Sequence, residues 1–147
     1  MEASLKKLEV YRLAHDLAVR IDAMSHTLPM TERFEEASQI RRSSKRVSAS
    51  IVEGHTQRKH KGLYLSYLYR ALGSSDETQE HLLLLRETRS LADAGVFDSL
   101  KAGCEELSKK LFNLIKVVEQ KYETPNYLKN LPLQAFESPL DDLNSMT

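Results

Sequence analysis

The chain contains a single cysteine, Cys104, and no tryptophan among its 147 residues. One thiol cannot form an intrachain disulfide, and it excludes a zinc site built mainly from cysteines. Since aromatic residues make up only 7% of the chain, the core must be largely aliphatic. Glycine and proline are also scarce, with five and four copies, and three of the prolines follow residue 124. Because both residues interrupt helices, their scarcity favours long helices over most of the chain.

Signals for membranes and for enzymatic chemistry are missing as well. No apolar run approaches the roughly 20 residues that a membrane-spanning helix needs. The N-terminal sequence MEASLKKLEVYR lacks the apolar region of a signal peptide, and we expect a cytoplasmic protein. There is no glycine-rich phosphate loop, no H-E-x-x-H motif and no pair of Glu-x-x-His motifs for a di-iron site. The sequence therefore predicts a non-enzymatic protein without a cofactor or a metal.

Four segments carry apolar residues at intervals of three or four, which is the spacing of amphipathic helices. The four stripes are Val10, Ala14, Leu17, Ile21, Met24 and Leu28; Phe34, Ala37, Ile40, Ser44, Val47 and Ile51; Leu65, Leu68, Leu72, Leu82, Leu83 and Leu85; and Phe97, Leu100, Cys104, Leu107, Leu111, Leu114 and Val118. The third helix is expected over about residues 61–89, and Cys104 is expected to be buried and inert. With short connections, these helices predict an all-α fold, an up-down-up-down four-helix bundle over residues 1–122.

The ends of the predicted helices follow from a few residues. Pro29 is expected to end the first helix, because its ring cannot continue the helix. Thr31 is a candidate N-cap for the second helix, with Glu32 in the first turn. Gly54 is expected just past the end of the second helix, and Gly95 in the turn after the third.

Residues 123–147 have a different character from the predicted bundle. Pro125, Pro132 and Pro139 forbid a continuous helix there. The segment nevertheless contains large apolar residues, among them Tyr127, Leu128, Leu131, Leu133, Phe136 and Leu140. We expect this tail to pack on the bundle or on a neighbouring subunit, with free solution as the alternative.

The chain has no net charge, but its charges are unevenly distributed. Residues 41–61 carry one carboxylate, Glu53, and seven cations: Arg41, Arg42, Lys45, Arg46, Arg58, Lys59 and Lys61. Residues 1–40 carry five cations and seven carboxylates, and residues 62–147 carry nine and thirteen. Arg42, Lys45 and Arg46 are expected on the face of the second helix that points away from its apolar stripe.

This basic stretch allows two interpretations. Cations gathered on one surface suit phosphate binding, because each neutralised phosphate releases counterions. Tyr64, Tyr67 and Tyr69 follow directly, and an exposed tyrosine could stack on an unpaired base. Alternatively, the cations pair with acidic faces of neighbouring helices, and the tyrosines are packing residues. The carboxylates available for such pairs include Glu32, Glu35, Glu36, Asp76, Glu77 and Glu80.

Small residues interrupt the third predicted helix at Gly73, Ser74 and Ser75. A glycine inside a helix costs roughly 1 kcal/mol relative to alanine. Small side chains offset this cost where another backbone approaches closely. The sequence therefore predicts a tight helix crossing here, within or between subunits, with a ligand pocket as the alternative.

Glu53 is expected in the last turn of the second helix, directly before Gly54. The helix dipole disfavours an anion at this position. We therefore expect Glu53 to have a cationic partner, with Arg41, Arg46 or Arg58 of the same or a neighbouring chain as candidates.

Several short motifs follow one another along the chain: Val10, Tyr11 and Ala14; Pro29, Glu32, Arg33 and Phe34; Gln39, Ile40, Arg42, Ser43 and Ser44; Val47, Ile51, Glu53 and Gly54; and Ala71, Gly73, Ser74 and Glu77. These motifs resemble those of the four-helix-bundle proteins related to the 23S ribosomal RNA intervening-sequence protein. They occur in the order of the family pattern and span about residues 8–120. Ser50 stands where the family prefers asparagine, Arg46 stands where it prefers serine, and the tail lies outside the pattern.

The resemblance implies a four-helix bundle that assembles as a ring-shaped homopentamer. Related proteins are encoded within intervening sequences of 23S rRNA genes, and no biochemical role is established for this branch. A more distant relative, the accessory variability protein of diversity-generating retroelements, binds a reverse transcriptase and nucleic acid through a basic surface. Two hypotheses follow for this chain: an oligomeric module that binds RNA or ribosomal RNA through its basic stretch, or an adaptor for a protein such as a reverse transcriptase. In the adaptor hypothesis, the contact could involve Leu131, Leu133 and Phe136.

Overall fold

The computed structural model describes residues 1–121 of the chain. Residues 122–147 lie outside the described part, and so do the predicted boundary at residue 122 and the expected packing of the tail. Within residues 1–121 the fold contains helices and no strands, which confirms the predicted all-helical class.

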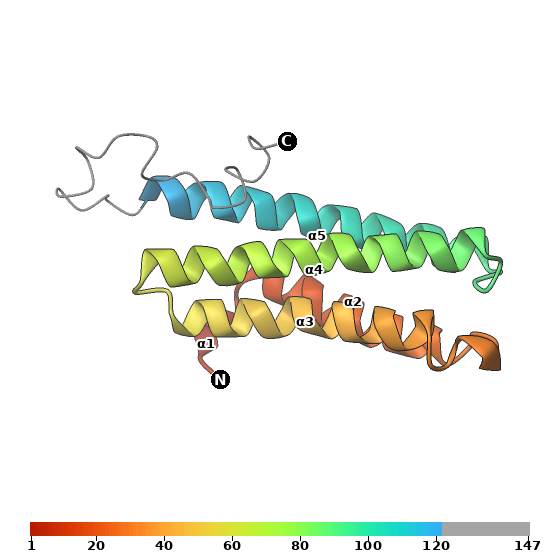
Figure 1. Ribbon diagram of the computed structural model, residues 1–147. Coiled ribbons are helices and arrows are strands. Elements are labelled where there is room, and N and C mark those ends of the chain that lie inside the picture. Colours follow the sequence, from red (N-terminus) through yellow and green to blue (C-terminus); the bar gives the residue numbers. More distant parts are fainter. Residues whose placement is uncertain (122–147) are drawn as a thin grey trace, which may run out of the picture.

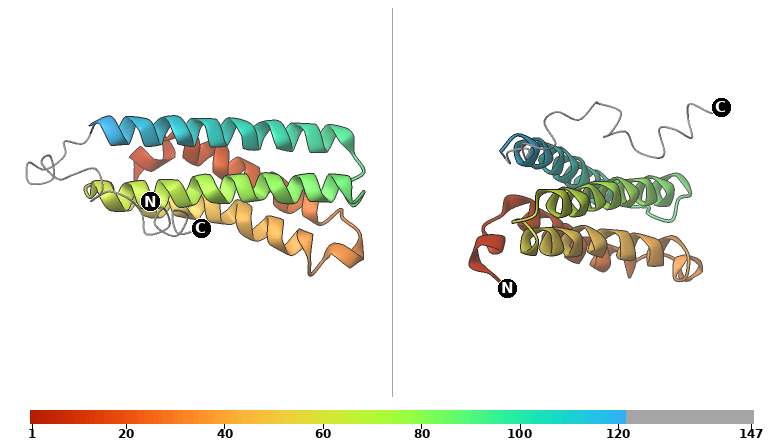
Figure 2. Two further views of the ribbon diagram at one scale, coloured as in Figure 1. Left: turned by 45° about the horizontal axis from the view of Figure 1, so that its top comes forward. Right: turned by 60° about the vertical axis from the view of Figure 1, so that its left-hand side comes forward.

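Four long helices pack side by side in antiparallel order (Figure 1). The elements are α1, Ala3–Lys6; α2, Glu9–Ser25; the 3-10 turn η1, Met30–Glu32; α3, Glu36–Thr56; α4, Lys61–Glu87; and α5, Ala94–Lys121. Each long helix contacts the next one in the sequence, and α5 returns to contact α2. The α2–α3 and α4–α5 connections lie at one end of the molecule, and the α3–α4 connection lies at the other end together with the end of α5 (Figures 1 and 2).

The core is aliphatic, as the composition predicts. Its fully buried large side chains are Ile21, Ile40, Ile51, Leu68, Leu82, Leu85, Leu111 and Ile115. Most residues of the predicted stripes point into this core, but six of them are only partly buried: Leu28, Leu65, Leu72, Leu83, Phe97 and Leu114. On α5, Ile115 takes the central position that the sequence pattern assigned to Leu114, because Ile115 continues the face of Leu111 and Val118.

Hydroxyl groups are buried between the helices and are satisfied there. The Thr78 hydroxyl on α4 lies 2.8 Å from Ser43 Oγ on α3 and 2.7 Å from the carbonyl oxygen of Ser74. On the other side of α4, the hydroxyls of Ser75 and Ser108 are 2.7 Å apart. Each bond offsets the desolvation of a small polar group, so serine and threonine can stand in the core where helices pass closely.

The start of the second predicted helix is wrong in two respects. Thr31 does not cap it, since residues 30–32 form a 3-10 turn and α3 begins only at Glu36. The Glu32 carboxylate accepts a hydrogen bond of 2.7 Å from Ser90, which ties this turn to the α4–α5 connection. Phe34 therefore precedes the helix and is 86% exposed rather than part of the apolar stripe.

The two predicted glycine turns are also wrong. Gly54 lies inside α3, which continues to Thr56, and Gly95 lies in the first turn of α5. In residues 1–121, the residue with a left-handed conformation is Arg89, at φ 67°, directly after the C-cap of α4. The α4–α5 connection thus turns at its start rather than at its glycine.

Small residues in the Gly73–Ser75 segment have separate roles. Ser74 and Ser75 are buried, and Ser75 faces α5. Gly73 is exposed, and a Cβ atom built on it would have no neighbour within 4 Å. The predicted tight crossing within the chain is therefore wrong for Gly73, while a contact of Gly73 with another subunit stays a prediction.

The close helix crossing lies instead at Gly54. A Cβ atom there would come within 2.9 Å of the Cβ atom of Tyr67 on α4. Since that atom is fixed to the backbone, α3 and α4 would have to separate. We expect Gly54→Ala to lower the free energy of unfolding by about 1–3 kcal/mol, which outweighs the helix propensity of alanine.

The matched control is Gly73→Ala on the exposed face of α4, which should raise the free energy of unfolding by roughly 0.5–1 kcal/mol. Urea denaturation followed by circular dichroism measures both changes. Equal effects of the two substitutions would contradict the close approach at Gly54. A destabilised Gly73→Ala would show that another backbone lies against Gly73.

Cys104 is 2% exposed in the α5 seam, as predicted. Burial raises the pKa of its thiol from the ordinary 9.0 to about 11. Since the thiolate is the reactive form, we expect the folded protein to react with Ellman's reagent at pH 8 at least about 100-fold more slowly than the unfolded chain. Equal rates in buffer and in urea would contradict this burial.

Candidate nucleic-acid interface

The seven cations of the basic stretch fall into two groups. Arg41, Arg42, Lys45 and Arg46 lie in the first half of α3, and Arg58, Lys59 and Lys61 lie in and beside the α3–α4 connection. Fourteen residues of helix separate Arg42 from Thr56, about 21 Å at 1.5 Å per residue. The uninterrupted charge run of the sequence therefore becomes two clusters on one edge of the molecule, called here the helix cluster and the connection cluster.

Two members of the helix cluster pair with carboxylates of neighbouring helices. Lys45 Nζ lies 3.0 Å from Asp22 Oδ1 on α2, and this hydrogen bond lowers the pKa of the Asp22 carboxyl. Arg46 donates a hydrogen bond of 3.1 Å to Glu77 Oε2 on α4. Both cations remain half-exposed, since 60% of the Lys45 side chain and 52% of the Arg46 side chain are accessible.

The other two members of the helix cluster differ in their surroundings. Arg41 lies at the boundary of the buried face and donates a hydrogen bond of 3.0 Å to Ser25 Oγ. Arg42 is exposed, and its guanidinium has no hydrogen bond or ion pair with residues 1–121. The expectation that Arg42, Lys45 and Arg46 point away from the core is confirmed by their exposure.

The connection cluster is organised by contacts at that end of the bundle. Arg58 pairs with Glu2 at 3.0 Å, and Lys61 donates a hydrogen bond of 3.0 Å to the carbonyl oxygen of Glu119. Lys59 is exposed and has no ion pair or hydrogen bond within the described part of the chain. Lys59 and Arg42 are therefore the two cations of the stretch that residues 1–121 leave unpaired.

A short N-terminal segment covers part of the connection cluster, and the sequence did not reveal it. Leu5 in α1 is 2% exposed and packs into the core. The Ser4 hydroxyl lies 3.0 Å from Nε2 of His55, which is buried in the last turns of α3. Leu5 lies between Ser4 and Lys6, outside the apolar stripe that begins at Val10, so the periodicity of the sequence carries no signal for this contact.

The three tyrosines after the basic stretch do not form one stacking surface. Tyr64 is buried, and the Arg70 guanidinium lies 5.3 Å from the centre of the half-buried Tyr67 ring. Tyr69 is half-exposed, but its hydroxyl donates a hydrogen bond of 2.9 Å to Glu119, which raises the tyrosine pKa. The packing interpretation describes Tyr64, and Tyr69 keeps an accessible ring face.

Glu53 is exposed, and no Arg or Lys among residues 1–121 lies within ion-pair distance of its carboxylate. A partner on a neighbouring chain stays a prediction. A different acidic group is organised around His81 of α4, whose Nδ1 lies 2.6 Å from Glu36 and whose Nε2 lies 3.4 Å from Glu77. The spacing of four residues between Glu77 and His81 on α4 indicates that these two side chains are neighbours. Glu36 lies on α3, and the sequence gives no signal for its contact with His81.

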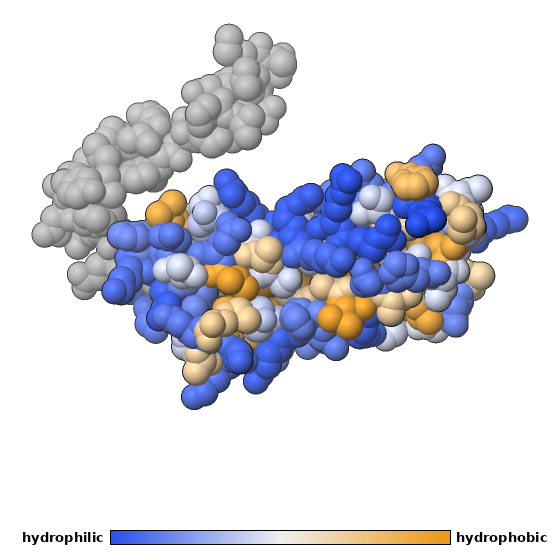
Figure 3. Space-filling view, turned by 90° about the horizontal axis from the view of Figure 1, so that it is seen from below, coloured by the Kyte–Doolittle hydropathy of each residue, from blue (hydrophilic) through white to orange (hydrophobic). Residues whose placement is uncertain are grey.

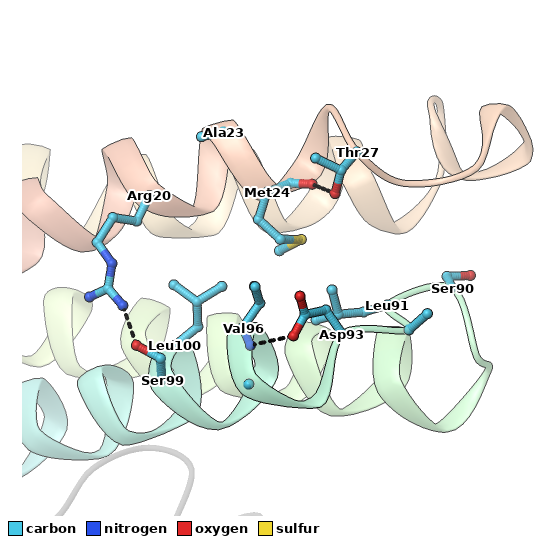
Figure 4. A pocket seen from close by; sticks show the side chains of 12 residues that line it. Arg20, Ala23, Met24, Thr27, Ser90, Leu91, Asp93, Val96, Ser99 and Leu100 are labelled. Carbon is cyan, nitrogen blue, oxygen red and sulfur yellow. Dashed lines mark hydrogen bonds between the residues drawn. The ribbon is translucent and has the colours of Figure 1, made fainter.

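An open groove lies at the opposite end of the bundle, between α2 and the α4–α5 connection (Figure 4). Its volume is about 890 Å³, and its walls include Met24, Leu91, Val96 and Leu100. The polar groups along it are already engaged: Arg20 donates a hydrogen bond of 2.6 Å to Ser99, and the Val96 amide donates one of 3.0 Å to Asp93. The groove therefore offers apolar surface without converging free polar groups, unlike most small-ligand sites.

The face formed by α2 and α3 is mostly hydrophilic, and its apolar side chains lie in small separate groups (Figure 3). Among residues 1–121, no group of three or more His, Cys, Asp or Glu side chains could hold a metal ion. No helix within that range is long and apolar enough to cross a membrane. The chemistry available on this face is the binding of anions by exposed guanidinium and ammonium groups.

Comparisons with known proteins give the same family as the sequence motifs. A crystal structure of a protein of unknown function from the S23 ribosomal protein family of Bacteroides thetaiotaomicron is similar, with a TM-score of 0.67 and 28% identity. The match covers 73% of this chain and 98% of that one. Comparison with the curated proteins finds no match. The family model of the 23S rRNA-intervening sequence protein matches residues 6–113, and the chain therefore belongs to this family.

Proposed function

We propose that the protein is a non-enzymatic, oligomeric module of the cytoplasm that binds RNA through the helix cluster and the connection cluster. The observation that carries the proposal is that each cluster holds one exposed cation, Arg42 or Lys59, which residues 1–121 leave without a partner. If all seven cations of residues 41–61 were buried or paired, the alternative would be favoured, in which these cations only hold the helices or subunits together. Ribosomal RNA is the expected ligand class, because the family is named for a sequence within 23S rRNA genes.

The ion pairs of Lys45 and Arg46 do not remove these cations from the surface. Exposed pairs contribute about 0–1 kcal/mol, because water and salt screen them. A phosphate group can therefore replace Asp22 or Glu77 as the partner at small cost. Lys45 and Arg46 follow Arg42 by three and four residues on α3, about one helical turn, which supports contact of one stretch of RNA backbone with all three cations.

Oligomerisation is the second part of the proposal. In the homopentamer implied by the family resemblance, each basic surface would be repeated five times on one assembly. Linked sites bind a long RNA with a higher apparent affinity than a single site, because the second contact becomes intramolecular. A modest surface on one chain is then sufficient for RNA binding at physiological salt.

The test is a double substitution, Arg42→Glu with Lys59→Glu, which removes one unpaired cation from each cluster. We expect weaker binding of a ribosomal RNA fragment at low salt, and a slope of log K against log salt that is reduced by about 2. Fluorescence anisotropy across a salt series measures the slope, and light scattering measures the oligomer.

The control is Arg12→Glu with Lys109→Glu, which changes the net charge equally on exposed residues of α2 and α5. We expect the control protein to bind RNA with nearly the same slope of log K against log salt as the unmodified protein. A small decrease would reflect only the change in net charge. RNA binding with the same slope in both double variants would refute the assigned surface.

A second candidate function, a protein adaptor, is favoured by two exposed apolar side chains in the α2–α3 connection. Phe34 is 86% exposed and Met30 is 79% exposed. Large apolar residues that project from a connection are typical anchors for a partner protein. The tail residues named for an adaptor contact lie outside the described part of the chain.

A photoreactive phenylalanine at position 34 tests the adaptor function in cells. We expect a cross-link to a second protein, identified by mass spectrometry, if Phe34 anchors a partner. The same group at Val19, which is also exposed, is the control. If the photoreactive group at position 34 reacts only with water, or if both positions cross-link to the same proteins, an adaptor contact at Phe34 is contradicted.

A further inference from the structure

The end of the bundle where α5 stops has an incomplete wall. Glu9, the first residue of α2, forms an ion pair with Lys110 of α5. Further along these two antiparallel helices, Arg20 of α2 donates a hydrogen bond to Ser99 of α5. In this register, the part of α5 after Lys110 extends beyond the start of α2. Its last 11 residues, about 16 Å of helix, therefore have no α2 residue opposite them (Figure 2).

An apolar hollow of about 380 Å³ lies at this place. It is lined by Arg58, Tyr64, Leu114, Val117, Val118 and Lys121. Val118 and Tyr64 form part of the core, whereas Val117 is 52% exposed although it belongs to the longest amphipathic helix. An exposed valine and a partly buried leucine beside a hollow leave apolar surface that a further segment of chain could cover.

The chain itself continues from the rim of this hollow. Lys121 ends α5 and lines the hollow, and 26 residues follow it. A segment that begins at its own docking site loses little entropy on closing the short loop. The six residues from Lys121 to Tyr127 can extend up to about 20 Å, which is enough to reach any wall of the hollow.

The composition of the tail complements the hollow in two ways. Residues 122–147 carry nine Tyr, Leu, Phe and Met residues, and they carry four carboxylate side chains against one lysine, a net charge of −3. The hollow has apolar walls with the cations Arg58 and Lys121, and the exposed Lys59 lies next to Arg58 in the sequence. Attraction between opposite charges and burial of apolar side chains therefore favour the same placement.

The comparisons set the hollow and the tail apart from the rest of the chain. The family model matches residues 6–113, and four of the six lining residues follow residue 113. Most of the lining of the hollow and the whole tail thus lie beyond the residues that the family model matches. We propose that residues 122–147 fold back on their own chain and place apolar side chains in this hollow, where they take the position that α2 leaves open.

Hydrogen–deuterium exchange of the full chain tests this docking. We expect amides of residues 122–147 to exchange at least about tenfold more slowly than in a synthetic peptide of the same sequence. Val117→Asp, which places a charge in the hollow at a half-exposed position, should return the exchange to the rate of the peptide. Val19→Asp is the control, because Val19 is 58% exposed and lies on α2 away from the hollow.

A mixing experiment separates docking on the same chain from docking on a neighbouring subunit. Full-length Val117→Asp protein labelled with nitrogen-15 is refolded together with unlabelled unmodified protein, and the labelled tail peptides are followed by mass. We expect the labelled tail to stay unprotected, because its own hollow is blocked.

Three results would overturn the proposal. The first is a tail that exchanges at the rate of the free peptide in the unmodified protein. The second is equal protection in the Val117→Asp and Val19→Asp proteins. The third is a labelled tail that regains protection in the mixture, which would place it on a neighbouring subunit.

Discussion

Gly54 lets the backbones of α3 and α4 approach so closely that even one added methyl group would meet the Cβ atom of Tyr67. The same interface buries the hydroxyls of Ser43 and Thr78, which satisfy each other where larger apolar side chains would hold the helices apart. Because α3 and α4 are fixed in this way, α2 and α5 can pack against them as the other half of the bundle. The remaining packing is aliphatic and depends on this central pair.

The position of α3 also determines which cations are accessible. With one face against α4 and another against α2, the outer face keeps Arg42 exposed and leaves Lys45 and Arg46 beside carboxylates at its edges. Such edge pairs are weak and hydrated, so they hold Lys45 and Arg46 in place while leaving them accessible. The basic surface nevertheless differs from the continuous charge run of the sequence, because only Arg42 and Lys59 of the seven cations lack a partner within residues 1–121.

Helical periodicity predicted the long helices, because burial of one face leaves a regular pattern of apolar residues such as that from Leu100 to Leu111. The ends of the helices were harder to predict, since they depend on contacts that are distant in the sequence. The bond between Glu32 and Ser90 holds η1 outside α3, and Gly54 serves packing rather than a turn. For the same reason the sequence offered Glu77 as a possible partner, which Arg46 confirms, but it did not identify Asp22 or Glu2 as partners. It also gave no signal for the contact between Ser4 and His55.

The order of the helices also has a consequence for folding kinetics. Helices α3 and α4 are joined by a short connection, so their interface forms from contacts that are local in the sequence. The interface between α2 and α5 joins residues about a hundred positions apart, such as Glu9 and Lys110. Closing so long a loop carries the larger entropic cost, and contacts of this kind form late in folding. The open groove beside Arg20 therefore lies along the seam whose contacts join the most distant parts of the described sequence.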